Sequence, residues 1–325
     1  MSALLTIEDL AIEFVTRRGN VPAVRGVSLH VTPGESLGLV GESGSGKSVL
    51  AHTVMGLLRL PGRVRRGQVR WKGEALSIEG HAGNDGVRGR QMSIVFQDAL
   101  AALNPLLTVG RQIEEVLEQH RNLSRSAARE RATELLTLVG IPDPALRLRG
   151  YPHEFSGGMR QRAMIAMALA AEPQLLIADE PTTALDVTIQ AQIIYLLRDL
   201  QARLGLAMLF ITHDLGVIAA MCDRLAVIYA GRIVESGPAS EVFARPAHPY
   251  TMGLLRSTPR LDTDRERLTS VDGSPPELLD LPVGCAFALR CPLADARCRA
   301  EDPRLNDVAT GRTAACFRPF TPAWP

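Results

Sequence analysis

The residues best suited to phosphate chemistry form a glycine-rich stretch, GESGSGKS (41–48), between an apolar run, SLGLV, and a helical pattern, SVLAHTVMGLL. Glycines let backbone N–H groups approach a phosphate closely, and the start of the following helix adds positive partial charge. The lysine offers an ammonium to the β- and γ-phosphates, and the last serine offers Mg²⁺ an oxygen ligand. The loop consists of Gly41, Glu42, Ser43, Gly44, Ser45, Gly46, Lys47 and Ser48.

A second candidate is the pair of carboxylates that ends the apolar strand LLIADEP (175–181). Asp179 at the strand tip is suited to hold Mg²⁺ through water, and Glu180 is suited to take a proton from an attacking water as a general base. The competing interpretation is a strand that simply ends in solvated acids. Gln97 ends the run MSIVFQ and His213 follows LFIT, and neither residue alone indicates a function.

The elements that must position these residues alternate between strands and helices. Residues 1–40 show strand periodicity, about 105–171 reads as helical with Ser124 or Ser126 as a cap, and 174–236 is a second α/β stretch. In that stretch, residues 187–204 form an amphipathic helix with Asp186 as N-cap and Gly205 as its stop. The predicted fold class is α/β with a mostly parallel sheet. From about residue 257 the composition changes to proline, arginine and cysteine, which marks a domain boundary.

Composition narrows the function classes. The 325 residues carry 36 basic and 35 acidic side chains, so the net charge of +1 argues against a dedicated nucleic-acid protein. No apolar run reaches the roughly 18–20 residues of a membrane helix, and the N-terminus shows no secretion signal. We expect a cytosolic protein that reaches a membrane only through a partner. The basic run RVRRGQVR (63–70) is expected to form a solvated turn before a strand rather than a nucleic-acid or lipid contact.

A second anion-binding helix start, FSGGMRQR (155–162), connects these motifs. With it, the chain resembles the nucleotide-binding subunit of an ABC transporter over roughly residues 4–256. The resemblance implies an ABC-type P-loop core with an antiparallel β subdomain and a helical subdomain at about 98–171. It also implies that Phe14 stacks on adenine, that Gln97 is the Q-loop residue, and that His213 is the switch histidine. Mg²⁺ would be held through Ser48, Gln97 and Asp179. Asp186 would lie in the D-loop (184–186), and the signature would consist of Ser156, Gly157, Gly158 and Met159.

The resemblance further implies a mechanism. Two such domains close head to tail and clamp ATP between the phosphate loop of one and the signature helix of the other. Closure drives paired transmembrane permease subunits, and hydrolysis resets them. Soluble relatives that act on DNA or ribosomes are a competing class. The separation of Lys47 and Ser156 is too short for their coiled-coil or zinc insertions, and the chain carries one cassette.

Three segments, at 181–193, 213–238 and 248–259, resemble the dipeptide/oligopeptide/nickel importer branch. That branch implies peripheral attachment at the cytoplasmic face of the membrane and an extracytoplasmic substrate-binding protein as an indirect partner. Met159 stands where the general signature has glutamine, which favours a heterodimer with a related ATPase over a homodimer. Peptide is the expected cargo, and nickel is the alternative.

The C-terminal extension, 257–325, gathers four cysteines, Cys285, Cys291, Cys298 and Cys316. In a reducing cytosol such a group favours a metal over disulfides, and the branch resemblance favours a [4Fe-4S] cluster. Zn²⁺ and a metal-free tail with small apolar core thiols remain the alternatives. The aperiodic tail has little core of its own, so a metal would stabilise it. Cys222 lies outside this set and is expected to be a core thiol.

Overall fold

A computed structural model of the chain describes residues 2–78, 86–183, 185–257 and 271–322. The chain divides into two compact units. The first combines residues up to 78 with the described residues from 210 onward, and the second comprises the described residues from 86 to 209. The strand β8 (Ala207–Thr212) carries the chain from the second unit back to the first.

An antiparallel sheet in the first unit has the strand order β2-β1-β4-β5. The strands are β1 (Leu5–Thr16), β2 (Gly19–Val31), β4 (Gly62–Trp71) and β5 (Glu74–Leu76). The basic run 63–70 lies inside β4, so the predicted turn is wrong. Pairing with β1 satisfies its backbone, and its arginines meet the β1 carboxylates Glu8, Asp9 and Glu13 in ion pairs.

A second sheet in the first unit contains β3 (Ser36–Val40), β9 (Arg224–Tyr229) and β10 (Arg232–Pro238). β3 is parallel to β9 and fully buried, as expected for a strand with both faces covered. The helices α1 (Lys47–Val54), α8 (Leu215–Met221), α9 (Ala239–Ala244) and α10 (Pro249–Ser257) complete this part of the unit.

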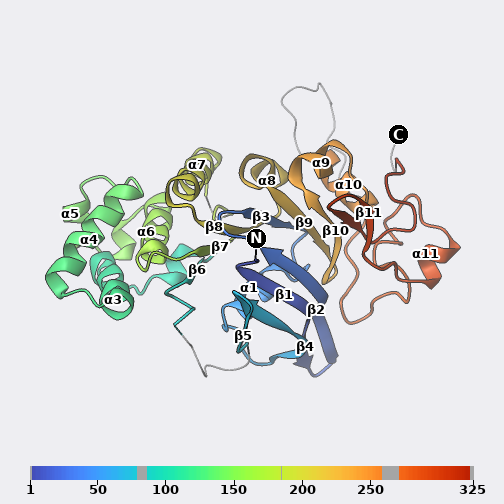
Figure 1. Cartoon of the computed structure of the whole chain (residues 1–325), viewed down its shortest axis with the longest axis horizontal. Coiled ribbons are helices and arrows are strands. Elements are labelled where there is room, and N and C mark those ends of the chain that lie inside the picture. Colours follow the sequence, from blue (N-terminus) through green and yellow to red (C-terminus); the bar gives the residue numbers. More distant parts are fainter. Residues whose placement is uncertain (1, 79–85, 184, 258–270, 323–325) are drawn as a thin grey trace. The chain divides into compact units, whose positions relative to one another are not determined.

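The C-terminal extension joins the same sheet (Figure 1). Its strand β12 (Arg312–Ala314) pairs antiparallel with β10, and β11 (Asn306–Ala309) pairs with β12. A short helix, α11 (Ala296–Ala300), precedes these strands. The extension therefore folds on the edge of the first unit instead of forming a core of its own.

A buried ion pair fastens the extension to this sheet. Glu235 of β10 has no exposed surface and accepts hydrogen bonds from the backbone N–H groups of Ala247 and His248, both at 2.8 Å. Its third partner is Arg312 of β12, whose Nη2 lies 3.0 Å from the carboxylate. The guanidinium also donates to the backbone oxygen of Arg245 at 2.7 Å. The carboxylate thus links a strand, a loop and the extension.

The second unit pairs a short parallel sheet with helices. β6 (Met92–Val95) is parallel to β7 (Leu175–Asp179). The main helices are α3 (Val109–Arg121), α4 (Arg125–Leu138) and α6 (Gly157–Leu169), which contact one another. The shorter elements are α2 (Ala99–Ala102), α5 (Pro144–Arg147) and the 3₁₀ turn Pro152–Glu154. Ser124 caps α4, as one of the two predicted serines.

The helix α7 (Val187–Leu204) follows the pattern expected from its sequence. The Asp186 carboxylate accepts the backbone N–H of Ile189 at 3.0 Å, and Gly205 ends the helix with a φ of 62°. The buried residues of this helix are Ile193, Leu196, Leu197 and Leu200, which lie on one apolar face. None of the helices in the described ranges is long and apolar enough to cross a membrane.

The buried pair at Glu235 leads to a stability prediction. Glu235→Leu leaves the Arg312 guanidinium without its carboxylate, which should lower the free energy of unfolding by about 3–5 kcal/mol. Denaturant unfolding of the full-length protein measures the loss. Glu301→Ala removes the exposed partner of Arg297 instead and should cost less than about 1 kcal/mol. Equal losses in the two variants would contradict the assigned role of Glu235.

Candidate functional site

The phosphate loop connects β3 to α1, which confirms the predicted strand, loop and helix order. The helix ends at Val54 and is therefore shorter than the predicted helix over 48–58. Gly46 is its N-cap with a φ of 101°, and Gly44 has a φ of 77°. Both values lie in the left-handed region that residues with a Cβ rarely adopt.

A close approach of the backbone requires glycine at position 46 but not at position 44. A Cβ on Gly46 would lie 2.4 Å from the backbone oxygen of Ala23 in β2, whereas a Cβ on Gly44 would meet nothing within 4 Å. Gly46 is therefore held by packing as well as by φ. Gly44 lies in open space, where a ligand has room to approach.

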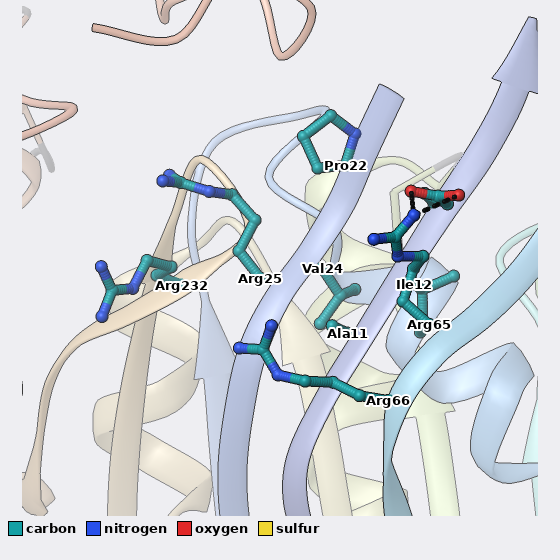
Figure 2. Close-up of a pocket in the computed structure, with 9 residues that line it drawn as sticks. Ala11, Ile12, Pro22, Val24, Arg25, Arg65, Arg66 and Arg232 are labelled. Carbon is teal, nitrogen blue, oxygen red and sulfur yellow. Dashed lines mark hydrogen bonds and ion pairs between the residues drawn. The ribbon is translucent and has the colours of Figure 1, made fainter. Parts of the chain in front are cut away.

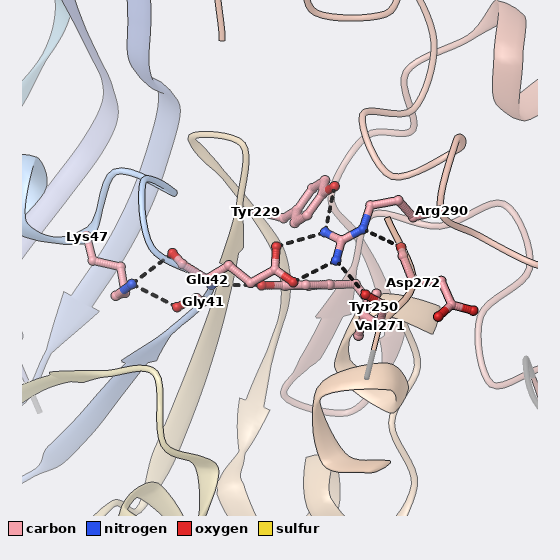
Figure 3. Close-up of polar contacts among 8 residues, drawn as sticks. All are labelled: Gly41, Glu42, Lys47, Tyr229, Tyr250, Val271, Asp272 and Arg290. Carbon is pink, nitrogen blue, oxygen red and sulfur yellow. Dashed lines mark hydrogen bonds and ion pairs between the residues drawn. The ribbon is translucent and has the colours of Figure 1, made fainter. Parts of the chain in front are cut away.

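The Lys47 side chain is buried at the base of the loop, with 4% of its surface exposed. Its Nζ donates to the backbone oxygen of Gly41 at 2.7 Å and to that of Glu42 at 3.0 Å (Figure 3). The backbone N–H of Glu42 in turn donates to the Tyr250 hydroxyl at 2.9 Å. The loop thus closes around its own ammonium group, which is a geometry suited to an anion.

A cavity of about 430 Å³ adjoins the loop within the first unit. The loop contributes Glu42, Ser43, Gly44 and Ser45 to its lining, and the extension contributes residues 275–279. Val21 of β2 also lines it. Phe14 in β1, which was predicted to stack on adenine, is half-buried and is the register partner of Val21.

A second cavity, of about 450 Å³, lies over the antiparallel sheet and is rich in arginine (Figure 2). Its charges are largely compensated within the unit. Arg65 contacts Glu13, Arg66 contacts Asp9, and both Arg25 and Arg232 contact Asp302. This cavity includes no residue of the loop 41–48 in its lining.

In the second unit, the structure brings Gln97 and Glu180 together. The Gln97 Nε2 donates to Glu180 Oε2 at 3.3 Å, and the Thr183 hydroxyl donates to the same oxygen at 2.9 Å. Glu180 is half-buried with a φ of 46°, and Asp179 before it is 2% exposed. Thr183 was not among the predicted site residues. The sequence feature that could have indicated Thr183 is the PTT run directly after the two acids.

The predicted signature begins the helix α6. The Ser156 hydroxyl accepts the backbone N–H of Met159 at 3.3 Å as N-cap, and Ser156 and Gly157 are exposed. Gly158 packs closely, because a Cβ there would lie 2.7 Å from Ile189 Cγ2 of α7. An exposed helix start with small residues leaves its free N–H groups accessible to an anion.

The remaining predicted residues lie at the ends of elements. Asp186 is exposed and caps α7, and His213 is exposed and directly follows β8. Of the predicted D-loop, 184–186, residue Ala184 lies outside the described residues.

In the extension, Cys291 and Cys298 lie within electrostatic reach of both Cys285 and Cys316. Burial is the main cause that raises the pKa of Cys285 to about 11. A backbone hydrogen bond at Phe287 opposes this increase, and Asp302, Cys298 and Cys291 make smaller contributions to it. Burial also raises the pKa of the Cys291 and Cys316 thiols, again with contributions from the other cysteines. In the described ranges, no group of three or more His, Cys, Asp or Glu side chains is arranged to hold a metal ion.

Cys222 lies apart from these four residues, at the end of α8. Burial raises the pKa of its thiol, and a Cβ on Gly38 of β3 would lie 3.2 Å from its sulfur. It is a core thiol, as the sequence predicted.

Comparison with solved structures identifies the class of protein. The chain is similar to a dimeric post-hydrolysis state of the ATP-binding cassette MJ0796 bound to ADP and Pi, with a TM-score of 0.63 and 26% identity over 72% of this chain and 98% of that one. It is also similar to cbiO1 from Clostridium perfringens, part of the ABC transporter complex cbiONQ, with a TM-score of 0.63 and 28% identity over 75% and 92%. The fold is that of an ABC ATPase cassette.

Sequence comparison defines the family. Residues 24–183 match the ABC transporter family, and residues 234–298 match the oligopeptide/dipeptide transporter C-terminal region. The chain is 54% identical to the oligopeptide transport ATP-binding protein OppD of Bacillus subtilis, over 89% of this chain and 82% of the relative. It is 48% identical to the dipeptide transport ATP-binding protein DppD of Escherichia coli, over 99% and 98%. The chain belongs to the ATP-binding subunits of ABC transporters, in the oligopeptide/dipeptide branch.

The two loop glycines provide a matched test of the site geometry. Gly46→Ala places a Cβ at a left-handed φ and also against a backbone oxygen. Gly44→Ala has only the conformational cost of the left-handed φ, which is about 1–2 kcal/mol. ATP titration of the full-length protein should therefore show a much larger loss of affinity for Gly46→Ala. Equal affinities in the two variants would show that the approach to Ala23 does not shape the loop.

Proposed function

We propose that the chain is the ATP-hydrolysing subunit of an ABC importer for dipeptides and oligopeptides. One observation carries the proposal: a single chain joins the ABC cassette to the oligopeptide-transporter C-terminal region, and close relatives share this arrangement over most of its length. The relatives named above are described as peptide transport proteins, which favours peptide over nickel as cargo. It also favours a transporter over a soluble ATPase that acts on nucleic acid or ribosomes.

In this proposal the first unit holds the nucleotide. The loop N–H groups and the Lys47 ammonium bind the phosphates, and Phe14 stacks on adenine. The burial of Lys47 among carbonyl oxygens supports the first role, because it fixes the charge at the base of the loop. Residues 41–48 form the binding loop.

Oxygen ligands suit Mg²⁺, and Ser48, Gln97 and Asp179 are proposed as the residues that would hold it. These residues would hold an ion that supplies positive charge close to the phosphates of ATP. The chemistry of this donor set fits the ion, since every assigned group is a hydroxyl, amide or carboxylate oxygen.

Glu180 is proposed to take the proton of the attacking water. Its hydrogen bonds from Gln97 and Thr183 support this role, because both donors reach one carboxylate oxygen and restrict the side chain. A general base of this kind contributes roughly 10²–10⁴-fold in rate. His213 is proposed as the residue that senses the γ-phosphate.

A complete site in this proposal needs two chains. Ser156, Gly157, Gly158 and Met159 would bind the ATP held by a second, related ATPase, with Asp186 at the same junction. The exposed start of α6 supports such a contact. Two permease subunits would anchor the dimer to the cytoplasmic face of the membrane and receive peptide from a substrate-binding protein. Residues 1–256 would form the nucleotide-binding domain and 257–325 the extension.

The four cysteines of the extension are proposed to bind a [4Fe-4S] cluster. Their spacing and their mutual effect on pKa support one shared ligand set. Zn²⁺ bound by the same four sulfurs is the alternative. Thiolate ligation would also convert metal binding into folding energy for the extension.

The proposed chemistry predicts a clear phenotype for Glu180→Gln. The amide keeps the size and most hydrogen bonds of the carboxylate but is not a base, so ATP should still bind while hydrolysis falls by at least about a hundredfold. The assay is ATP hydrolysis and uptake of a labelled peptide in proteoliposomes that contain the complete transporter.

Glu172→Gln is the matched control. Glu172 also has a positive φ and flanks β7, but it pairs with Arg121 and Arg131 at the surface. Its substitution should leave hydrolysis and uptake at wild-type levels. Hydrolysis within tenfold of wild type in Glu180→Gln would exclude Glu180 as the base. Wild-type transporter that hydrolyses ATP without importing any peptide would contradict the proposed cargo.

Serine substitutions test the cluster. Replacing any one of Cys285, Cys291, Cys298 or Cys316 should release iron, since each thiolate is one of four ligands. Anaerobically purified wild type should be brown with about four irons per chain, and Cys222→Ser should retain this content. One zinc per chain in colourless protein would replace the cluster with the second interpretation, and four free thiols without metal would remove both.

A further inference from the structure

One side chain of the extension reaches the phosphate loop within the first unit. The Arg290 guanidinium binds both carboxylate oxygens of Glu42, with Nη1 at 2.7 Å and Nη2 at 2.9 Å (Figure 3). Glu42 is the second residue of the loop, and Arg290 lies 248 positions later, between Cys285 and Cys291. A bidentate pair of this kind fixes both the position and the charge of its carboxylate.

The surroundings of Arg290 hold it in one place. Its side chain is 5% exposed, and it also donates to the Tyr229 hydroxyl at 3.3 Å and to the backbone oxygens of Val271 and Asp272 at 3.1 and 3.0 Å. The guanidinium carbon lies 5.8 Å from the ring centroids of Tyr229 and Phe287. Together with Glu42, these groups hold the guanidinium in one orientation.

Glu42 sits at a sensitive point of the loop. Its backbone N–H donates to Tyr250, and its backbone oxygen accepts from Lys47. Its side chain is only 24% exposed, and Glu42 lines the cavity beside the loop. A carboxylate at this point would repel a triphosphate unless a nearby cation neutralised it, because like charges interact strongly away from bulk water.

We propose that Arg290 is a positioning residue of the ATP site, which neutralises Glu42 and holds its carboxylate away from the phosphates. The extension then sets the affinity of the phosphate loop for nucleotide, and any change that displaces residues 285–291 weakens ATP binding. This inference rests on the proposed role of residues 41–48 in holding the phosphates. Lys47→Ala tests that role by itself, since its failure to weaken ATP binding would remove the proposed function.

The test measures nucleotide affinity of the full-length protein by calorimetry. Arg290→Gln should weaken ATP binding about tenfold and ADP binding less, because ADP carries less charge. Glu42→Gln combined with Arg290→Gln removes both charges and should restore ATP affinity to within about threefold of wild type. A purely structural role for Arg290 would not produce this rescue.

Two further variants keep the outcome decisive. Arg290→Lys retains the charge even if Arg290→Gln folds poorly, and its ATP affinity should stay within about threefold of wild type. Asp9→Asn breaks a similar bidentate pair with Arg66 on the exposed antiparallel sheet and should leave ATP affinity unchanged. The proposal is overturned if Arg290→Gln binds ATP as tightly as Asp9→Asn, if the double variant stays as weak as the single one, or if Arg290→Lys also loses tenfold.

Discussion

A buried ammonium group is the constraint on which the first unit depends. Lys47 is almost fully buried, so its charge must be met by oxygen atoms at short distance, and the backbone of the loop supplies them at Gly41 and Glu42. That requirement forces the loop to curl, which in turn requires left-handed glycines and close approach to β2. A loop folded in this way presents N–H groups and positive charge to an anion, and the buried strand β3 holds it in place.

The extension supports this loop instead of forming a separate body. Its contacts with the rest of the first unit include the pairing of β12 with β10, the buried ion pair of Glu235 with Arg312, and the pair of Arg290 with Glu42. Phe287 adds an edge-on ring contact with Tyr229, with centroids 5.3 Å apart. A segment with little apolar sequence of its own thus gains stability by sharing the core and the charges of the nucleotide-binding unit.

In the second unit, short-range hydrogen bonds stabilise the starts of the helices. Three of its helices, α4, α6 and α7, begin at the caps Ser124, Ser156 and Asp186, each of which accepts a backbone N–H three residues ahead. Such caps satisfy N–H groups that have no partner within the helix. The N-cap hydrogen bond that starts α6 therefore also sets the backbone conformation of the signature segment at Ser156. Local sequence is sufficient to specify these starts, because donor and acceptor are close in the chain.

The sequence alone determined what depends on short-range order and on motif: the phosphate loop between strand and helix, the capped helix after Asp186, the core thiol at Cys222 and the family. Tertiary structure decided the contacts between distant segments. Examples are the pairing of β12 with β10, the strand in place of a turn at 63–70, the hydrogen bond from Gln97 to Glu180, and the Arg290–Glu42 pair. The partners of these residues cannot be read from spacing. Burial and charge neutralisation act between residues that are neighbours in space, and only the folded chain determines which residues these are.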